Sequence, residues 1–284
     1  MKKSFKYQLK KILPIVAEQP HGNNAAASKY VTISLQRSGQ HAVINWICEQ
    51  MQDIVHFNHC RFERRGYTNW ISPINNRVIY HNNGEKRDSG IQSRSDMLDF
   101  LSTIDGYRRL LYSFEDLDIE DYSLRKYIKI EKPIVILILR DPYNWLASSI
   151  KHDKSSEASL VVKKNSLIKY LEQVLEIRDY FQGPYVDINY NRWVVDVGYR
   201  ETVCSRLGIQ FSIAADKSVM DIQEFGGGSS FDGAESSGGD LHARIFERWK
   251  LYSTDEFYRG LLDDRHLADL TEAYFNIENP LDIT

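Results

Sequence analysis

The 284-residue sequence lacks features that mark several large classes of protein. Its three cysteines, Cys48, Cys60 and Cys204, are odd in number and widely spaced, which argues against a disulfide framework and fits a reducing compartment. It has no run of about 18 apolar residues, so we expect no membrane span and no integral membrane contact. Its 36 Lys and Arg against 39 Asp and Glu give a net charge of −3, which excludes a global basic field for nucleic acid but not a local basic patch.

The composition, 42% apolar and 26% charged, is typical of a globular protein. We expect residues 1–28 to form a basic N-terminal arm and linker, and residues 29–284 to form a single α/β domain of a cytoplasmic protein. Residues 226–239, GGGSSFDGAESSGG, are rich in glycine and serine and predict a flexible loop. This loop is either a surface insertion or a lid that orders over a ligand.

Short apolar or β-branched runs alternate with segments of helical periodicity. The alternation predicts right-handed βαβ units and a three-layer, P-loop-like α/β domain, with a central, mostly parallel sheet flanked by helices. The run Ile134–Leu139 is apolar throughout, as expected of a strand covered on both faces. We expect strands at 29–35, 77–80, 109–114, 134–139 and 185–188, and helices after His41, from Ser95, from Pro142 with Asp141 as its cap, at 165–181 and at 191–207, the last ended by Gly208.

The segment from Gln36 to Ala42 joins the first strand to a helix through a single glycine, Gly39. Such a turn points backbone N–H groups outward at the positive end of the helix dipole, so it predicts a phosphate or sulfate site, although an ordinary βα turn has the same outline. The turn lacks the second glycine and the Lys-Ser/Thr pair of a Walker A loop, which argues against a Mg²⁺–NTP enzyme. Its further polar donors are Arg37, Ser38, Gln40 and His41.

Arg140 follows the buried run 134–139, and Ser148 comes eight residues later. Ligands of open α/β sheets lie outside the carboxyl ends of the strands, where an arginine can hold a phosphate with a fork of donors. An arginine at this place can also be a structural ion-pair partner. Together with the Gln36–Ala42 turn, however, Arg140 suggests one ligand with two separated acidic groups.

These residues resemble motifs of the sulfotransferases that use 3′-phosphoadenosine 5′-phosphosulfate (PAPS) as sulfuryl donor and release adenosine 3′,5′-bisphosphate (PAP). The segment Leu35–His41 looks like the family's loop for the 5′-phosphosulfate, with Arg37 at the basic position. Gln40 and His41 stand where the family has two threonines. Arg140 and Ser148 match the spacing of the family's pair on the 3′-phosphate.

Two later segments are similar to the family as well. Tyr190 matches a tyrosine near the adenine, although Asn191-Arg192 replaces the family's acidic pair. Ser229–Phe231 and Arg248-Trp249-Lys250 resemble a loop that closes on the 3′-phosphate and the basic-Trp pair after it. The resemblance, which covers about a third of the chain, implies no metal and the following donor-binding residues: Arg37, Ser38, Gly39, Gln40, His41, Ala42, Arg140, Ser148, Tyr190, Ser229, Ser230 and Phe231.

The family takes its general base from a strand between the two phosphate motifs, and two residues fit that place. Glu115 follows the strand 109–114 and is the favoured base; it also lies in an acidic run that reads as solvated surface. His81 follows the strand 77–80 and is the alternative. Arg37 would absorb charge on the leaving phosphate. The segment His56–Cys60 contains two histidines and a cysteine, which are possible metal ligands, but no CxxC supports a metal site. We expect a strand or loop near the sheet edge there.

The resemblance implies a sulfotransferase that moves a sulfuryl group from PAPS to a hydroxyl or amine of a glycan or small metabolite. A kinase-like phosphotransferase on the same architecture, which would depend on ATP and Mg²⁺, is one alternative. A non-catalytic nucleotide- or glycan-binding module is another, because Gln40 and His41 depart from the family's loop. No motif identifies the acceptor.

Overall fold

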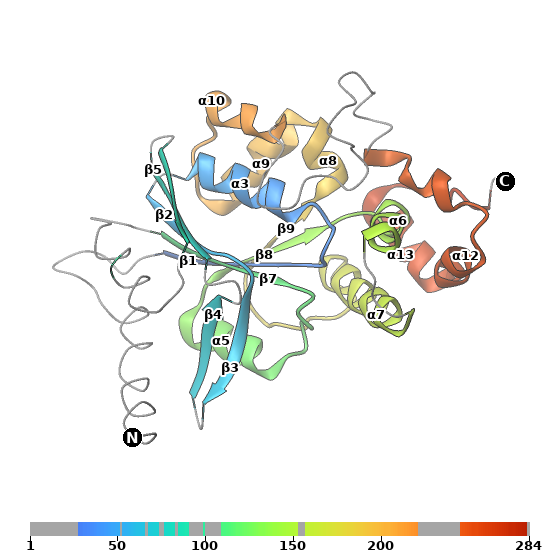
Figure 1. Ribbon diagram of the computed structural model, residues 1–284, viewed down its shortest axis with the longest axis horizontal. Coiled ribbons are helices and arrows are strands. Elements are labelled where there is room, and N and C mark those ends of the chain that lie inside the picture. Colours follow the sequence, from blue (N-terminus) through green and yellow to red (C-terminus); the bar gives the residue numbers. More distant parts are fainter. Residues whose placement is uncertain are drawn as a thin grey trace.

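A seven-stranded sheet runs through the centre of the computed structural model (Figure 1), which describes residues 28–51, 53–65, 68–73, 77–82, 85–90, 99, 109–152, 157–220 and 245–282. Five neighbouring strands are parallel, and two more extend one edge in antiparallel fashion. Across the sheet the order is β6 (Glu85–Gly90), β5 (Arg77–Asn82), β2 (Ile54–Phe57), β7 (Arg109–Glu115), β1 (Ser28–Ser34), β8 (Ile134–Leu139) and β9 (Tyr185–Asn189). The predicted fold class, α/β with a mostly parallel sheet flanked by helices, is confirmed.

The central strands are apolar because both of their faces are covered. Successive side chains of a strand point to opposite faces. In β8, Val135, Leu137 and Leu139 pack into one hydrophobic cluster, whereas Ile136 and Ile138 pack into the other. All five of these side chains are at most 1% exposed, which explains why the sequence shows an unbroken apolar run instead of alternation.

Helices form the two outer layers (Figure 1). One face of the sheet packs against α3 (Gln40–Gln50), α8 (Tyr190–Val195) and α9 (Val197–Leu207), beside which lie the short α10 (Ile213–Asp216) and η2 (Lys217–Met220). The other face is covered by α5 (Tyr122–Glu131), α6 (Pro142–His152), α7 (Glu157–Val174), α12 (Glu256–Leu262) and α13 (Arg265–Phe275). A separate hairpin of β3 (Cys60–Arg65) and β4 (Thr68–Pro73), not predicted from the sequence, adjoins β7 on this side, and η4 (Arg248–Tyr252) packs on α6.

The position of β2 corrects one expectation. The string His56–Cys60 was expected near the sheet edge, but β2 lies inside the sheet between β5 and β7. The reason is the hairpin of β5 and β6, which adds two strands beyond β2. The charged sequence of β6, EKRDSG, carries no strand signal.

Two helix boundaries also differ from the prediction. The helix expected at 165–181 is α7, which ends at Val174, because Glu176 adopts a left-handed conformation (φ 57°) and the N–H of Ile177 donates back to the carbonyl of Glu172. The helix expected at 191–207 is divided into α8 and α9. Asp196 divides it, since its carboxylate caps α9 by accepting from the N–H of Tyr199. Gly208 ends α9 with φ 70°, as predicted.

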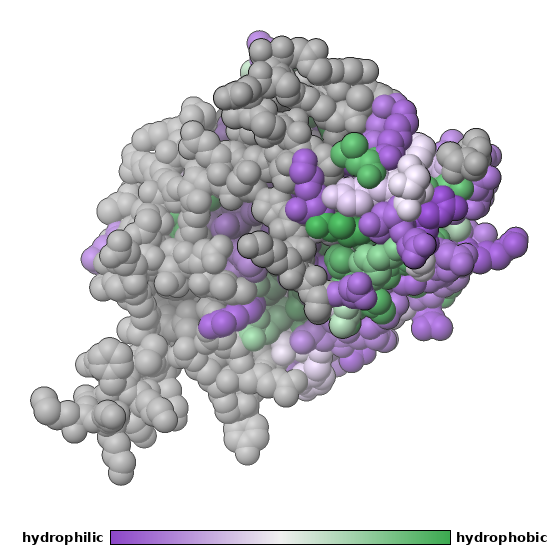
Figure 2. Space-filling view, turned by 45° about the vertical axis from the view of Figure 1, so that its right-hand side comes forward, coloured by the Kyte–Doolittle hydropathy of each residue, from purple (hydrophilic) through white to green (hydrophobic). Residues whose placement is uncertain are grey.

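The helix expected from Ser95, the basic arm at 1–27 and the Gly/Ser-rich segment 226–239 lie outside the described residues. Within the described part of the chain, no helix is long and apolar enough to cross a membrane. The side of the molecule with the C-terminal helices presents mainly hydrophilic residues with small apolar groups between them (Figure 2).

Candidate functional site

The candidate site is the edge of the sheet where the parallel strands end. Ser34, the last residue of β1, stands in register with Glu115 of β7, and Leu139, the last of β8, with Asn189 of β9. The segments that follow these strands therefore meet at one edge, which is where open α/β sheets bind ligands. The turn after β1 is the centre of this edge.

The turn takes two left-handed residues to reach α3. Arg37 has φ 72° and Gly39 has φ 85°, and the N–H of Ser38 donates to the carbonyl of Leu35 (3.1 Å). Gly39 is required for a second reason: a Cβ there would lie 2.3 Å from Cε2 of Tyr190. The hydroxyl of Ser38 is buried just before the helix N-terminus and has no hydrogen-bond partner among the described residues. An orphaned buried donor beside the positive end of a helix dipole is what an anion site requires.

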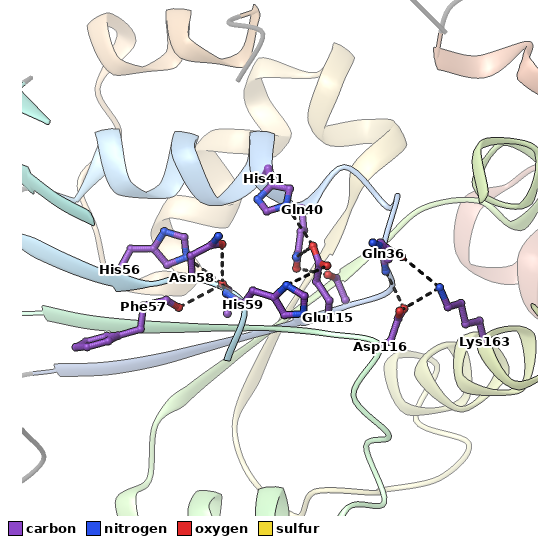
Figure 3. Close-up of polar contacts among 12 residues, drawn as sticks. Gln36, Gln40, His41, His56, Phe57, Asn58, His59, Glu115, Asp116 and Lys163 are labelled. Atoms are coloured by element: carbon purple, nitrogen blue, oxygen red, sulfur yellow. Dashed lines mark hydrogen bonds and ion pairs between the residues drawn. The ribbon is translucent and has the colours of Figure 1, made fainter. Parts of the chain in front are cut away.

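Three contacts fix the start of the turn at Gln36. Its N–H donates to Oδ1 of Asp116 (2.9 Å), and its carbonyl accepts from the indole N–H of Trp145 (2.9 Å). Lys163 of α7 reaches both the side-chain oxygen of Gln36 (3.3 Å) and Oδ2 of Asp116 (3.2 Å) (Figure 3). The turn is therefore held from β7, α6 and α7 at once.

Beside the turn lies a group that we call the acid–imidazole cluster, made of Glu115, Gln40, His41 and His59 (Figure 3). Oε1 of Glu115 lies 3.2 Å from Nε2 of His41 and also accepts from the side-chain amide of Gln40. Its Oε2 lies 3.9 Å from Nδ1 of His59. Gln40 in turn accepts from the hydroxyl of Ser34, so the amide links the ends of β1 and β7.

Glu115 is a carboxylate at neutral pH. Burial raises its pKa, but the hydrogen bond from His41, the charges of His41 and His59 and the hydrogen bond from Gln40 outweigh that effect and leave the pKa below its usual value. The side chain is 9% exposed, against 29% for His41 and 32% for His59. Of the three groups, the imidazoles are therefore the ones that an incoming molecule can reach.

His59 owes its place to a buried serine. The hydroxyl of Ser113, in β7, accepts from the backbone N–H of His59 (3.1 Å) and lies 3.0 Å from Nε2 of His56. Because Ser113 is fully buried, its hydroxyl fixes the backbone of His59 beneath the acid–imidazole cluster.

A second group, the arginine cluster, consists of Arg140, Ser148 and Arg248. Arg140 follows β8, is 3% exposed and donates to the carbonyl of Ile245 (2.7 Å). Its Nε has no hydrogen-bond partner, and no carboxylate of the described residues forms an ion pair with it. The guanidinium of Arg248 donates to the hydroxyl of Ser148 (3.2 Å). Because buried charges in proteins are paired, an uncompensated buried arginine indicates a site for an anion.

A buried acid holds this cluster together without neutralising it. Asp141 caps α6 by accepting from the N–H of Asn144 (2.8 Å), and it also accepts from the amides of Asn144 and Asn191. Asn144 then accepts from the backbone N–H of Arg248 (2.8 Å). The late segment at 245–248 is in this way attached to the ends of β8 and β9.

Tyr190 joins the turn to the arginine cluster. Its ring packs against Gly39 on one side, and the guanidinium of Arg140 lies 5.3 Å from its centroid. The ring also stacks on Trp193 at 5.7 Å, which fixes it on α8. Gly39 of the turn and the guanidinium of Arg140 therefore both lie beside the ring of Tyr190.

The structure brings together most of the residues singled out in the sequence: Arg37, Ser38, Gly39, Gln40, His41, Ala42, Glu115, Arg140, Ser148 and Tyr190. It does not bring His81 to them. His81 pairs with Ile54, at the opposite end of β2 from the site, because β5 runs antiparallel, and its Nδ1 lies 3.6 Å from Glu49. Ser229, Ser230 and Phe231 lie outside the described residues.

Three contributors were missed from the sequence. His59 was noticed only within a possible metal string, whereas it faces Glu115. Asn144 carries no motif, although, three residues after the cap Asp141, it stands where a capping partner is expected. Asn191 was noted only as a departure from the family's acidic pair, whereas its amide donates to Asp141. Within the described part of the chain, no group of three or more His, Cys, Asp or Glu side chains is arranged to hold a metal ion.

Comparisons with known proteins give a likeness of overall shape. No family model matches the sequence, and no curated protein matches it. Mouse sulfotransferase SULT7A1, solved in complex with PAP, has a TM-score of 0.48 at 16% identity, covering 92% of this chain and 89% of that one. The sulfotransferase domain of the Synechococcus PCC 7002 olefin synthase has a TM-score of 0.47 at 12% identity, covering 93% and 99%. A sulfotransferase from Alicyclobacillus acidocaldarius has a TM-score of 0.42 at 12% identity, covering 90% and 98%. Likeness at this level carries no conclusion about activity, so the site is judged on its own geometry.

Proposed function

We propose that this protein transfers a sulfuryl group from PAPS to a hydroxyl or amine of an acceptor and leaves PAP. The observation that carries the proposal is the pair of unsatisfied anion-binding features at one sheet edge. The buried Ser38 hydroxyl at the start of α3 and the buried Nε of Arg140 both lack partners among the described residues. A nucleotide with separate 5′ and 3′ anionic groups has the chemistry to satisfy both.

The residues at the edge divide between the two ends of such a donor. Arg37, Ser38 and the backbone N–H groups from Gly39 to Ala42 would hold the 5′-phosphosulfate, aided by the helix dipole. The arginine cluster would hold the 3′-phosphate with charge-assisted hydrogen bonds. Tyr190, between them, would lie near the adenine.

Sulfuryl transfer requires positioning and charge neutralisation at the leaving phosphate, and the donor carries its own leaving group. Arg37 and the α3 N-terminus would take up the charge that develops on the 5′-phosphate. The acceptor must lose a proton to a base within about 3 Å. The acid–imidazole cluster holds titratable side chains directly beside the N-terminus of α3, so we assign the proton transfer to it.

The first test is thermal unfolding of the full chain with PAP, with 5′-AMP and with ATP–Mg²⁺ in turn. A ligand that binds only the native state stabilises it by RT ln(1 + [L]/Kd). We expect a clear rise in Tm with PAP and a much smaller one with 5′-AMP, which lacks the 3′-phosphate. A rise with ATP–Mg²⁺ alone would favour the phosphotransferase alternative, and no rise with any ligand would remove the proposal.

A second test separates an enzyme from a binding module. Labelled PAPS is incubated with the protein and a set of alcohols, phenols, amines and saccharides. Transfer of label identifies the acceptor class. Tight PAP binding with no release of PAP from PAPS under any condition would favour the non-catalytic module.

A further inference from the structure

The approach of Oε1 of Glu115 to Nε2 of His41 favours one protonation state of the imidazole. An ionised carboxylate can only accept hydrogen bonds. With Oε1 of Glu115 3.2 Å away, the proton of a neutral His41 is favoured on Nε2, which leaves Nδ1 with its lone pair. No hydrogen bond or ion pair joins Nδ1 to the described residues.

The carboxylate itself is poorly placed to act on a substrate. Oε1 receives two donors, from Gln40 and His41, and Oε2 faces His59. Its side chain is about a third as exposed as that of His41, 9% against 29%. Histidine is also the side chain that most often serves as a general base in enzymes.

Of the two imidazoles, His41 is the one that adjoins the turn in the chain. It is the second residue of α3, directly after the turn that holds Ser38 and Gly39. His59 comes from the loop after β2, and at 3.9 Å its Nδ1 is beyond hydrogen-bond distance of the carboxylate. Among the described residues, the charged or titratable group beside this Glu115–His41 pair is thus His59.

We propose that His41 is the general base of the sulfuryl transfer and that Glu115 is the residue that positions it; this rests on the function proposed above. The hydroxyl proton of the acceptor moves to Nδ1 of His41, and the oxygen lone pair forms the new bond to sulfur. The bond from sulfur to the 5′-phosphate oxygen breaks, and its electron pair leaves on PAP. The resulting imidazolium is stabilised by the carboxylate of Glu115, as in other carboxylate–imidazole pairs.

This assignment differs from the one that the sequence resemblance implies, in which His41 is a donor ligand and Glu115 the base. The two assignments make opposite predictions for His41→Ala. A donor ligand lost at this place would weaken PAP binding. A base lost at this place would leave the Kd for PAP and the KM for PAPS nearly unchanged and lower kcat, typically by about 100-fold or more.

The experiment uses the full chain and three readouts. PAP affinity and release of labelled sulfate from PAPS, with water as the acceptor, are measured for the wild type, His41→Ala, His59→Gln and Glu115→Gln. The exposed His266→Gln, on α13, is the matched control. In parallel, the ¹⁵N chemical shifts of labelled imidazoles report which nitrogen of His41 carries the proton at neutral pH.

The proposal expects the Nε2–H tautomer in the wild type, unchanged PAP affinity in His41→Ala, and a kcat loss that is larger for His41→Ala than for His59→Gln. Glu115→Gln should shift the tautomer balance of His41 as well as lower kcat. An Nδ1–H tautomer in the wild type, a tenfold loss of PAP affinity in His41→Ala, or a larger kcat loss in His59→Gln would each overturn it. Absence of PAP binding in the wild type would instead refute the proposed function, while the tautomer measurement would still report on the Glu115–His41 pair.

Discussion

The acid–imidazole cluster and the arginine cluster lie at the same edge of one sheet, at the ends of β7 and β8 on either side of β1, yet they differ in how their charges are neutralised. Glu115 is surrounded by groups that donate to it or carry opposite charge. Arg140 is more deeply buried, at 3% exposed, but has one backbone carbonyl and no carboxylate among the described residues. A satisfied buried charge can stay in place unaided, whereas an unsatisfied one favours a ligand of opposite sign. Under the proposed function, this contrast distinguishes the acid–imidazole cluster, assigned to proton transfer, from the arginine cluster, assigned to phosphate binding.

The largest expected effect comes from removing the unsatisfied charge. Arg140→Ala should weaken PAP binding by about 2–5 kcal/mol, because a buried, charge-assisted pair with the phosphate is lost. Arg140→Lys should recover part of this, since it keeps the charge but not the fork of donors. Calorimetric titration measures both. Arg206→Ala, at a surface pair with Asp187, is the control; equal losses in the two alanine variants would mean that Arg140 has no special role.

The second effect is expected where the Gln36–Ala42 turn packs against Tyr190, which in turn contacts Arg140. Gly39→Ala places a Cβ against Tyr190 at a left-handed backbone position, so we expect a loss of about 2–4 kcal/mol in the free energy of unfolding, from backbone strain and the steric clash. Gly208→Ala is a matched control with φ 70° and no neighbour within 4 Å, and it should cost about 1 kcal/mol. Urea unfolding measures the difference, which Gly39→Ala/Tyr190→Ala should reduce; equal losses at the two glycines would disprove the contact.

The satisfied charge should make stability depend on acid. Because the pKa of Glu115 is lower in the folded protein than in the unfolded chain, its contribution is complete above the unfolded pKa, about 4.3, and is lost as the pH falls through the folded value. The difference in unfolding free energy between the wild type and Glu115→Gln should therefore shrink as the pH drops below about 4.3. Urea unfolding at a series of pH values tests this, and a difference that grows towards acid would contradict the sign.

The smallest effect is expected at the support of the turn. Lys163→Met removes a half-buried ion pair with Asp116 and should cost about 1 kcal/mol or less in stability, with a change of only a few-fold in PAP affinity. Lys169→Met, which breaks an outer pair with Asp118 and Glu120, should leave PAP affinity unaffected. If both variants bind PAP alike, the contact of Lys163 with Gln36 has no part in shaping the turn.

Much of the fold could be predicted because its signals are local. The run 134–139, the glycine turn at Gly39 and the cap Asp141 each determine their own conformation, and all three are where they were expected. The position of β2 could not be predicted, because it depends on pairing with β5 and on a charged edge strand. The end of α7 was missed because a glutamate, and not a glycine, takes the left-handed position.

The same distinction between local signals and long-range pairing applies to the candidate site. Residues directly after strands, such as Glu115 and Arg140, could be placed at one edge from the alternation of strands and helices. The antiparallel direction of β5 could not be predicted. His81 was therefore considered for a site that lies at the other end of the strands. The pairing of His41 with Glu115 and His59 depends on contacts between three elements, which no spacing in the sequence encodes.

The charged strand β6, which made the position of β2 unpredictable, also matters for the edge of the sheet. An uncovered strand edge offers unpaired backbone groups to other chains, and charged side chains are the usual protection against such pairing. Glu85, Lys86, Arg87 and Asp88 stand on the outermost strand, next to β5 with its buried Val78, Ile79 and Tyr80. In the order of the described strands, β6 separates β5 from the edge of the sheet, so a chain without β6 would present the backbone of β5 there.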